Sequence, residues 1–302
     1  MIPTLAIAAI LIGADPASIP KPLPISAHNC YPSNSRSDDR LVRALALGID
    51  NIEIDLGWDA AGGRLIVGHD SAPREGRIYP ELAEYVIPAL ERHRKAGRPD
   101  NAPTVLTIDW KTTEPEAVRN FKAFLDDHAD WFSSAPKVAG SALVPRRLTV
   151  CLTGDDRAKE AYDALIPPGG TYRAFRDKVF GAGAYFDNLD DYAPRPADTY
   201  FRFLTFHWAT IERGAPAAAG DWTPAEAARL KTLMTLVHNR GYRARFYCLN
   251  GSRSLGTILY AFPTPDAARA RWHAAADAGV DFIATDDYAE IVAELRGERG
   301  PD

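Results

Sequence analysis

The sequence predicts an α/β protein built as a single closed (β/α)₈ barrel, the TIM barrel architecture. The first observation is that runs rich in Val, Ile, Thr and aromatic residues alternate with helix-like runs along most of the 302 residues. The second is length, because eight βα units in about 280 residues match the size of one such barrel. The third is that neither an internal repeat nor a flexible linker divides the chain. A doubly wound open sheet is the alternative.

The expected elements follow from periodicity and turn residues. Strands are expected at residues 24–28, 51–57, 104–110, 147–152, 202–207, 244–249 and 281–286, with an eighth within 178–187. Helices are expected at 37–47, 80–96, 114–131, 155–165, 223–239, 265–278 and 287–296. Two begin with "TTEPEA" and "TPAEAA", in which Thr can cap the helix and Pro can occupy its first turn. Segments 166–199 and 209–222, rich in Pro, Gly and Asp, are expected to be loops that could cover a site.

Charge and the first residues limit the class of protein. A net charge of -5 and scattered arginines provide no basic face for a nucleic-acid backbone, so no nucleic-acid partner is expected. The opening "MIPTLAIAAILIGADPAS" places an apolar run before small residues, which predicts a signal peptide over 1–18 and export to the periplasm or the medium. A disordered or core-packed amino terminus, and a cytoplasmic protein, are the alternatives. The barrel would then occupy 19–298, and no transmembrane segment is expected.

Two neighbouring strands carry acids on one face. In "IEIDL" the aliphatic residues alternate with Glu53 and Asp55, and in "LTIDWK" the same alternation puts Asp109 and Lys111 together. With the aliphatic face against the helices, the acids point into the barrel, where an unpaired carboxylate costs several kcal/mol. Three converging carboxylates suit one hard divalent cation, Mg²⁺ or Ca²⁺. The alternative is an internal salt-bridge network with Lys111 or an arginine, but one lysine cannot neutralise three carboxylates.

Two histidines flank these acids. His28 ends the first strand in "ISAHNCYP", and His69 follows the second strand in "VGHD". Active sites of such barrels form at the carboxyl ends of the strands, where both histidines fall. A pair of imidazoles can serve as base and acid on opposite sides of a reacting centre. His207, in "FHW" at another strand end, could line the same pocket.

Other side chains lie at or just past strand ends. Trp58 and Trp208 are candidates for the pocket wall, whereas Trp110 is expected to pack between barrel and helices. Asn250 is expected at the catalytic rim. Asp286 is interpreted as the cap of the helix that follows it, with a place at the rim as the alternative.

Several sequence elements together resemble one family. They are "AHN", "IEIDLGW", the "GGRLIVGHD" hairpin, "LTIDWKT" and "AGVDFIATDD", in order between residues 27 and 287. The set resembles the glycerophosphodiester phosphodiesterase and phosphatidylinositol-specific phospholipase C superfamily, whose members are metal-assisted barrels. "HN" followed by Tyr31, with "GHD" and "DWKT", is most similar to the altered-inheritance-of-mitochondria-type branch. The Asp-x-Lys-Thr element also resembles sphingomyelinase D enzymes.

The resemblance implies roles for particular residues. These are the acid–base pair His28 and His69, the metal ligands Glu53, Asp55 and Asp109, and Lys111 near the phosphate. Asn29 stands where the family usually has Arg, which removes a bidentate phosphate clamp, and Cys30 stands where the family has Asp. Both departures concern the substrate more than the type of reaction.

These observations predict a metal-dependent phosphodiesterase that cleaves a glycerophosphodiester or a phospholipid head-group phosphodiester. Its expected phosphate- and substrate-binding residues are Asn29, Lys111, Trp58, His207, Trp208 and Asn250. One alternative is a barrel that binds phosphoesters or lipid head groups with little turnover. Another is a sphingomyelinase D-like phospholipase that forms a cyclic phosphate. A metal-dependent lyase or isomerase would leave the histidine pair unexplained.

Overall fold

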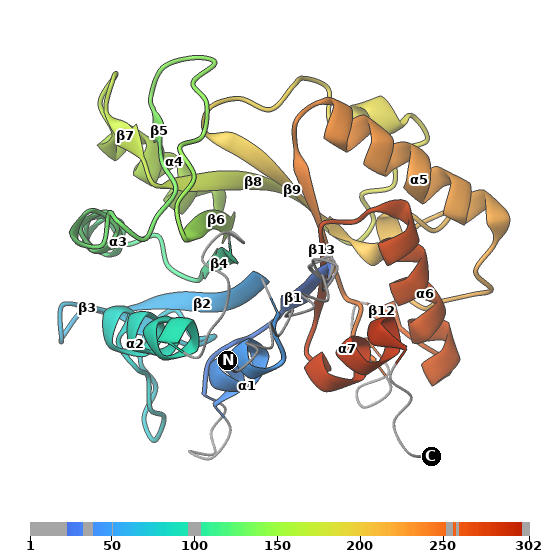
Figure 1. The fold of residues 1–302 in the computed structure, drawn as a ribbon, viewed down its shortest axis with the longest axis horizontal. Coiled ribbons are helices and arrows are strands. Elements are labelled where there is room, and N and C mark those ends of the chain that lie inside the picture. Colours follow the sequence, from blue (N-terminus) through green and yellow to red (C-terminus); the bar gives the residue numbers. More distant parts are fainter. Residues whose placement is uncertain are drawn as a thin grey trace, which may run out of the picture.

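Eight parallel strands form a closed ring in the described part of the chain. The computed structural model describes residues 23–32, 39–49, 51–95, 104–251, 256–257 and 260–297. The strands are β1 (Ile25–Ala27), β2 (Asn51–Asp59), β4 (Thr104–Trp110), β6 (Leu148–Gly154), β8 (Ala174–Phe180), β9 (Phe201–His207), β10 (Arg243–Tyr247) and β13 (Phe282–Thr285). Because β1 pairs with both β13 and β2, the ring closes. The protein is therefore a (β/α)₈ barrel, as predicted, and the open sheet is excluded (Figure 1).

The eighth strand lies earlier in the chain than predicted. The sequence predicts it within 178–187, but β8 covers Ala174–Phe180 and the chain leaves the sheet after it. Gly181 and Gly183 follow directly, and Gly183 adopts a φ of 84°, which a strand cannot accommodate. The expected loop 166–199 therefore contains β8, the short strand β7 (Thr171–Tyr172) and the 3₁₀ helix η1 (Leu189–Tyr192).

Helices surround the ring of strands on its outer side (Figure 1). They are α1 (Arg40–Ala46), α2 (Leu82–Lys95), α3 (Pro115–Asp127), α4 (Asp156–Leu165), α5 (Pro224–Asn239), α6 (Pro265–Ala278) and α7 (Tyr288–Arg296). Each overlaps an expected helix, although α3 ends before residue 131 and residues 37 and 38 lie outside the described residues. Residues 181–200, all described, connect β8 to β9 without an α-helix.

One of the two predicted threonine caps is confirmed. Thr223 accepts the Glu226 backbone N–H at the start of α5, and the Glu226 carboxylate bonds back to Thr223, forming a capping box. In "TTEPEA", however, the residue before Pro115 is Glu114, and this residue occupies the cap position without a side-chain bond. The Thr112 hydroxyl accepts the backbone N–H of Glu114 instead, because Pro at the first helical position fixes the cap at the residue before it.

Short elements complete the barrel. The strand β3 (Arg64–Val67) pairs antiparallel with β2 and extends the sheet outward. Two-stranded ladders join β5 (Ala135–Pro136) to β7, and β11 (Gly256–Thr257) to β12 (Tyr260–Ala261). The 3₁₀ helix η2 (Trp208–Thr210) begins one residue before the expected loop at 209–222 and includes the first two residues of that loop.

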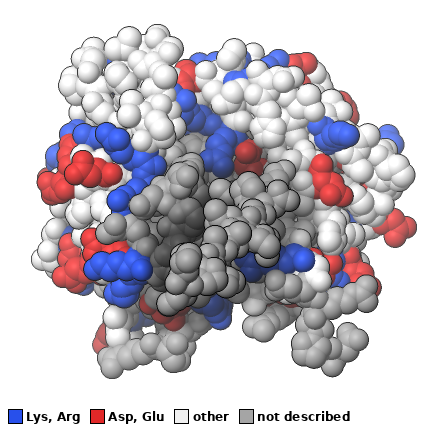
Figure 2. All heavy atoms as spheres, viewed as in Figure 1, with Lys and Arg blue, Asp and Glu red and all other residues white. Residues whose placement is uncertain are grey.

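The core lies between the strands and the helices, as the alternation predicts. Ile52, Ile54 and Leu56 of β2 are fully buried, and Trp110 packs edge-on against Phe121 of α3 with ring centroids 5.2 Å apart. Among the described residues, no helix is both long and apolar enough to cross a membrane. The expected signal peptide at 1–18 lies outside the described residues. Figure 2 shows acidic and basic side chains interspersed on the face seen in Figure 1.

Candidate active site

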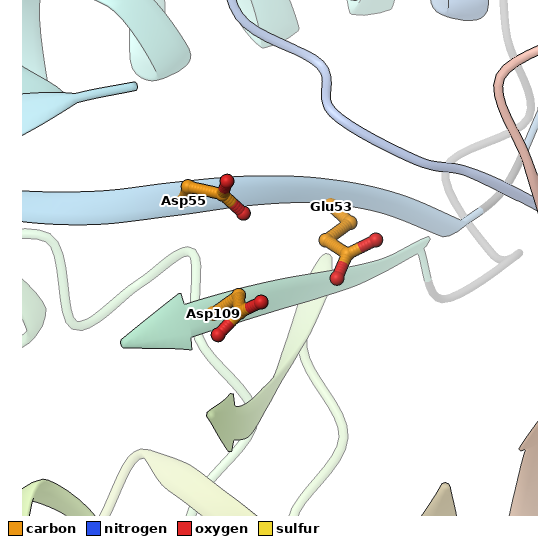
Figure 3. A group of neighbouring side chains, drawn as sticks. All are labelled: Glu53, Asp55 and Asp109. Carbon is orange, nitrogen blue, oxygen red and sulfur yellow. The ribbon is translucent and has the colours of Figure 1, made fainter. Parts of the chain in front are cut away.

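The acids predicted from strand alternation converge inside the barrel. Asp55 of β2 lies directly opposite Asp109 of β4 in the parallel register, and Glu53 lies two residues earlier on β2. Each of the three side chains offers a carboxylate oxygen within 4.8 Å of the others. Figure 3 shows them projecting from the two neighbouring strands toward one another. This group could hold a metal ion, because such oxygen ligands suit a hard divalent cation.

Two glycines make room for the acidic group. Gly57 is the next residue on this face of β2, and a Cβ there would overlap the carbonyl oxygen of Asp70. Glycine at this position therefore lets the backbone of the segment after β3 pass close to β2. A Cβ at Gly154, at the end of β6, would overlap the Asp109 carboxylate, and Gly154 has a φ of 81°. Both positions require glycine because backbone or a site carboxylate occupies the space.

Two cations share the acidic group. Lys111 donates to Asp109 over 2.7 Å and lies 3.5 Å from Asp55. Arg245 of β10 reaches across the barrel and donates to Glu53, and both side chains are almost fully buried. Three carboxylates and two cations leave one unbalanced negative charge. The internal salt bridges that the sequence offered as the alternative to a metal site are therefore present in this cluster. They leave one of the three carboxylates without a hydrogen-bond donor among the described residues.

The unsatisfied acid is Asp55. Its side chain is fully buried, and neither carboxylate oxygen accepts a hydrogen bond from the described residues. The nearby Tyr31 hydroxyl donates to Asn29 instead, over 2.7 Å. Burial raises the pKa of Asp55 to about 7, since Lys111 only partly offsets the burial and the charges of Glu53 and Asp109. A buried carboxylate without donors is the environment that a bound cation would satisfy, so the residues present fit a metal ion.

His28 is held rigidly beside Glu53. Its backbone N–H donates to Thr285 of β13 over 3.0 Å, and its carbonyl accepts from Arg40 and from the hydroxyl of Tyr288. The ring places Nε2 3.7 Å from the Glu53 carboxylate, while Nδ1 lies 3.3 Å from Asp286. Nε2 therefore faces Glu53, and Nδ1 faces Asp286 on the opposite edge of the ring.

Asp286 is the common acceptor of several hydrogen bonds next to His28. Its carboxylate accepts from Asn29 over 3.0 Å, from Arg40 over 2.5 Å and from Asn250 over 2.9 Å, besides facing His28. These partners lower the pKa of Asp286 well below its usual range despite its burial. The interpretation of Asp286 as a helix cap is wrong. The residue before α7 is Asp287, and the Asp286 carboxylate binds side chains at the rim instead.

His69 lies in the loop after β3, and a buried neighbour anchors this loop. Its neighbour Asp70 is buried and bound by Tyr79 over 2.5 Å, Arg77 over 2.7 Å and Arg74 over 2.8 Å. The His69 ring is exposed, and its pKa responds to the charges of Lys111, Asp109 and His28. The structure thus places His28 beside the acidic group, and the charges of Asp109 and Lys111 influence His69.

The two histidines differ electrostatically. Burial lowers the pKa of His28, but Glu53 and Asp286 outweigh it, so the pKa lies above its usual value. Partial burial and Lys111 lower the pKa of His69. Acid–base catalysis by a pair requires one imidazole that donates a proton and one that accepts it, and the opposite directions of these two pKa shifts favour such a division.

The aromatic candidates lie elsewhere. Trp58 is buried and shares the strand face of Leu56, opposite to Glu53 and Asp55. Trp208 is fully buried in η2 and donates to Glu212 over 3.0 Å. The structure therefore does not bring either indole to the acids. Asn250 and Asn29, in contrast, both bond to Asp286 at the rim.

His207 is a fully buried neutral imidazole. Its Nδ1 accepts the Ala209 N–H over 3.1 Å, its Nε2 has no partner among the described residues, and its ring meets Tyr247 edge-on. Burial lowers the pKa of His207 to about 4.

A pH-dependent stability follows from His207. The unfolded chain binds a proton at this residue below about pH 6.5 and the folded chain only below about pH 4, so folding stability falls as pH drops through this window. The cost at pH 4 is on the order of 3 kcal/mol. Urea unfolding of wild type and His207→Asn between pH 7 and pH 4 should therefore show a shallower decline for the variant. Parallel curves would contradict the prediction.

Sequence reasoning missed two arginines. Arg245 lies mid-strand on the same face as Tyr247, and a charged residue there signals a buried acidic partner, although its identity could not be read from the sequence. Arg40 occupies the first position of α1, where a charged residue is common, so the sequence does not indicate that it has a partner in the site.

Comparison with known proteins supports the fold at low sequence identity. No family model and no curated protein matches the chain. Among solved structures, a glycerophosphodiester phosphodiesterase from Parabacteroides distasonis is 16% identical, with a TM-score of 0.51 over 90% of this chain and 96% of its own. The chain has the fold of the glycerophosphodiester phosphodiesterases. An Oleispira antarctica phosphodiesterase, in complex with its product sn-glycerol-3-phosphate, is 14% identical, with a TM-score of 0.53 over 91% and 97%.

A third structure gives the same result. It is a glycerophosphoryl diester phosphodiesterase described as putative, from Silicibacter pomeroyi, 13% identical, with a TM-score of 0.52 over 91% of this chain and 95% of its own. Since this chain covers nearly the full length of each, the likeness extends to the whole barrel.

Proposed function

We propose that this protein is a metal-dependent phosphodiesterase acting on a glycerophosphodiester or on a phospholipid head-group phosphodiester. The observation that carries the proposal is the pair of unsatisfied Asp55 oxygens, buried beside Glu53 and Asp109, with His28 3.7 Å from Glu53. The position at the carboxyl ends of the strands supports it, because barrel enzymes place their active sites there. The sn-glycerol-3-phosphate bound by the Oleispira antarctica structure supports a small phosphodiester as the substrate.

The chain's own residues supply the acid–base chemistry. A divalent cation held by Glu53, Asp55 and Asp109 would neutralise charge that develops on the phosphate during the reaction. One of His28 and His69 accepts a proton from the attacking water or substrate hydroxyl, and the other donates a proton to the departing alkoxide. Lys111 adds a positive contact for the phosphate.

Asp286 is the positioning residue for His28. Asp286, 3.3 Å from Nδ1, and the Asn29 amide, 2.9 Å from the same nitrogen, hold the ring so that Nε2 faces Glu53. Asn29, which replaces the usual Arg, donates to Asp286 and accepts from Tyr31. We also propose that the protein belongs with the altered-inheritance-of-mitochondria-type branch and that an N-terminal signal peptide exports it. Sequence motifs alone support both points.

A second candidate is a barrel that binds phosphoesters with little turnover. The observation that favours it is that Lys111 and Arg245 already neutralise two of the three acids. Such a site could hold a phosphoester without turning it over.

Hydrolysis assays separate the two candidates. Bis(p-nitrophenyl) phosphate and glycerophosphodiesters are offered with EDTA, and then with Mg²⁺ or Ca²⁺ restored. We expect activity that EDTA removes and one of the ions restores, because the acidic group requires a cation to act on phosphate. Activity that is unaffected by EDTA would contradict metal dependence. Absence of activity with every ion would favour the binding protein.

A further inference from the structure

Arg245 occupies an unusual place for a cation in a metal-binding barrel. It lies mid-strand on β10, only 5% exposed, and its guanidinium crosses the interior to Glu53 on β2. Its Nε also lies 3.5 Å from the Ser26 hydroxyl of β1. One side chain thus links three barrel strands next to the acids.

The contact uses a carboxylate that the proposed ion would also need. The Glu53 Oε2 atom that accepts from Arg245 is the atom that lies 3.7 Å from His28. The ion and the guanidinium therefore compete for the same group. A positive charge at this distance also repels a divalent ion, and the interior dielectric screens that repulsion poorly.

We propose that Arg245 is a resident cation that shares Glu53 with the divalent ion. Without the ion, it keeps Glu53 paired and the barrel stable. With the ion, it lowers affinity, so that Asp55 and Asp109 carry more of the binding. This inference rests on the proposed function, because it assumes that the acids bind an ion.

The charge balance supports this role. With Arg245, the three carboxylates face two cations and one negative charge remains. Without it, two negative charges would remain inside the barrel, and the buried Glu53 would keep only the His28 ring, 3.7 Å away, as a possible partner. A buried carboxylate that loses its partner is strongly destabilising unless another cation replaces that partner.

Ion binding and unfolding, measured on the full chain, test the proposal without any assay of turnover. Arg245→Met and Arg245→Gln remove the charge, and Arg245→Lys retains it. Arg271→Met is the matched control, because Arg271 is an equally buried arginine paired with Glu212, away from the acidic group. Isothermal titration with MgCl₂ and CaCl₂ gives the Kd, and thermal unfolding in EDTA or in saturating ion gives the Tm.

The expected results separate a role at the site from a structural role. The neutral Arg245 variants should bind the ion on the order of tenfold more tightly than wild type. Their Tm should fall in EDTA and recover in saturating ion, whereas Arg245→Lys should keep a Kd close to that of wild type. Arg271→Met should lose the same Tm with and without the ion.

Other outcomes distinguish the inference from the proposed function. An unchanged Kd in Arg245→Gln, or a Tm loss that the ion does not recover, overturns the inference and leaves the proposed function intact. Binding by Arg245→Gln but not by wild type supports the inference and counts against metal-dependent activity in the natural protein. If no variant and no wild-type sample binds either ion, both are overturned.

Discussion

Replacing His28 or His69 with alanine is expected to reduce turnover by about 10²- to 10⁴-fold while leaving the fold intact. Each imidazole provides a proton transfer that the other cannot replace. The fold should survive because Asp286 keeps Arg40 and Asn250 as partners when His28 is removed, and the His69 ring is exposed. The measurement is kcat on bis(p-nitrophenyl) phosphate with the restored ion, together with thermal unfolding.

His238→Ala is the matched control for the histidine variants. His238 lies in the last turn of α5 and pairs with Asp281 on the surface, away from the acids. Its removal should leave kcat unchanged. If the His28→Ala, His69→Ala double variant folds well and retains phosphodiesterase activity, histidine acid–base catalysis is not the mechanism.

Asp55→Asn is expected to abolish ion-dependent activity and to stabilise the protein in EDTA. The amide removes a buried charge that has no hydrogen-bond donor, which is worth about 1–3 kcal/mol. The same change removes a ligand oxygen with its charge, so added ion should no longer raise the Tm. Urea unfolding in EDTA and with saturating ion measures both effects.

Asp177→Asn gives the contrast for Asp55. Asp177 is fully buried like Asp55, but it pairs with buried Lys159 over 2.9 Å. Breaking that pair should destabilise the protein by about 3–5 kcal/mol, with or without the ion. A loss of stability in Asp55→Asn similar to that in Asp177→Asn would show that Asp55 has a structural partner and is not kept for a ligand.

The sequence was sufficient to predict which side chains face the barrel interior. A period of two along "IEIDL" and "LTIDWK" placed Glu53, Asp55 and Asp109 on one face, and the parallel register then set Asp55 opposite Asp109. Regular strands permit such predictions, because the side-chain direction depends only on position along the strand.

The remaining parts of the site depend on contacts between distant segments. Arg245 and Glu53 are 192 residues apart, so no local pattern identifies them as partners. Asp286 and Asp287 are adjacent acids, and only the path of the chain after β13 decides which one precedes the helix. Trp208 directly follows a strand end, but the 3₁₀ turn there directs its indole to Glu212.

The link between His28 and Asp286 joins the first barrel strand to the last across 258 residues. The same strands close the ring through the pairing of β1 with β13, and the His28 backbone N–H is bound by Thr285. During synthesis on the ribosome, every other part of the proposed site therefore emerges before the residues that fix its first histidine. A nascent chain stalled before β13 would carry both histidines and all three acids, yet His28 would lack its support, so activity should appear only when the last strand has been released.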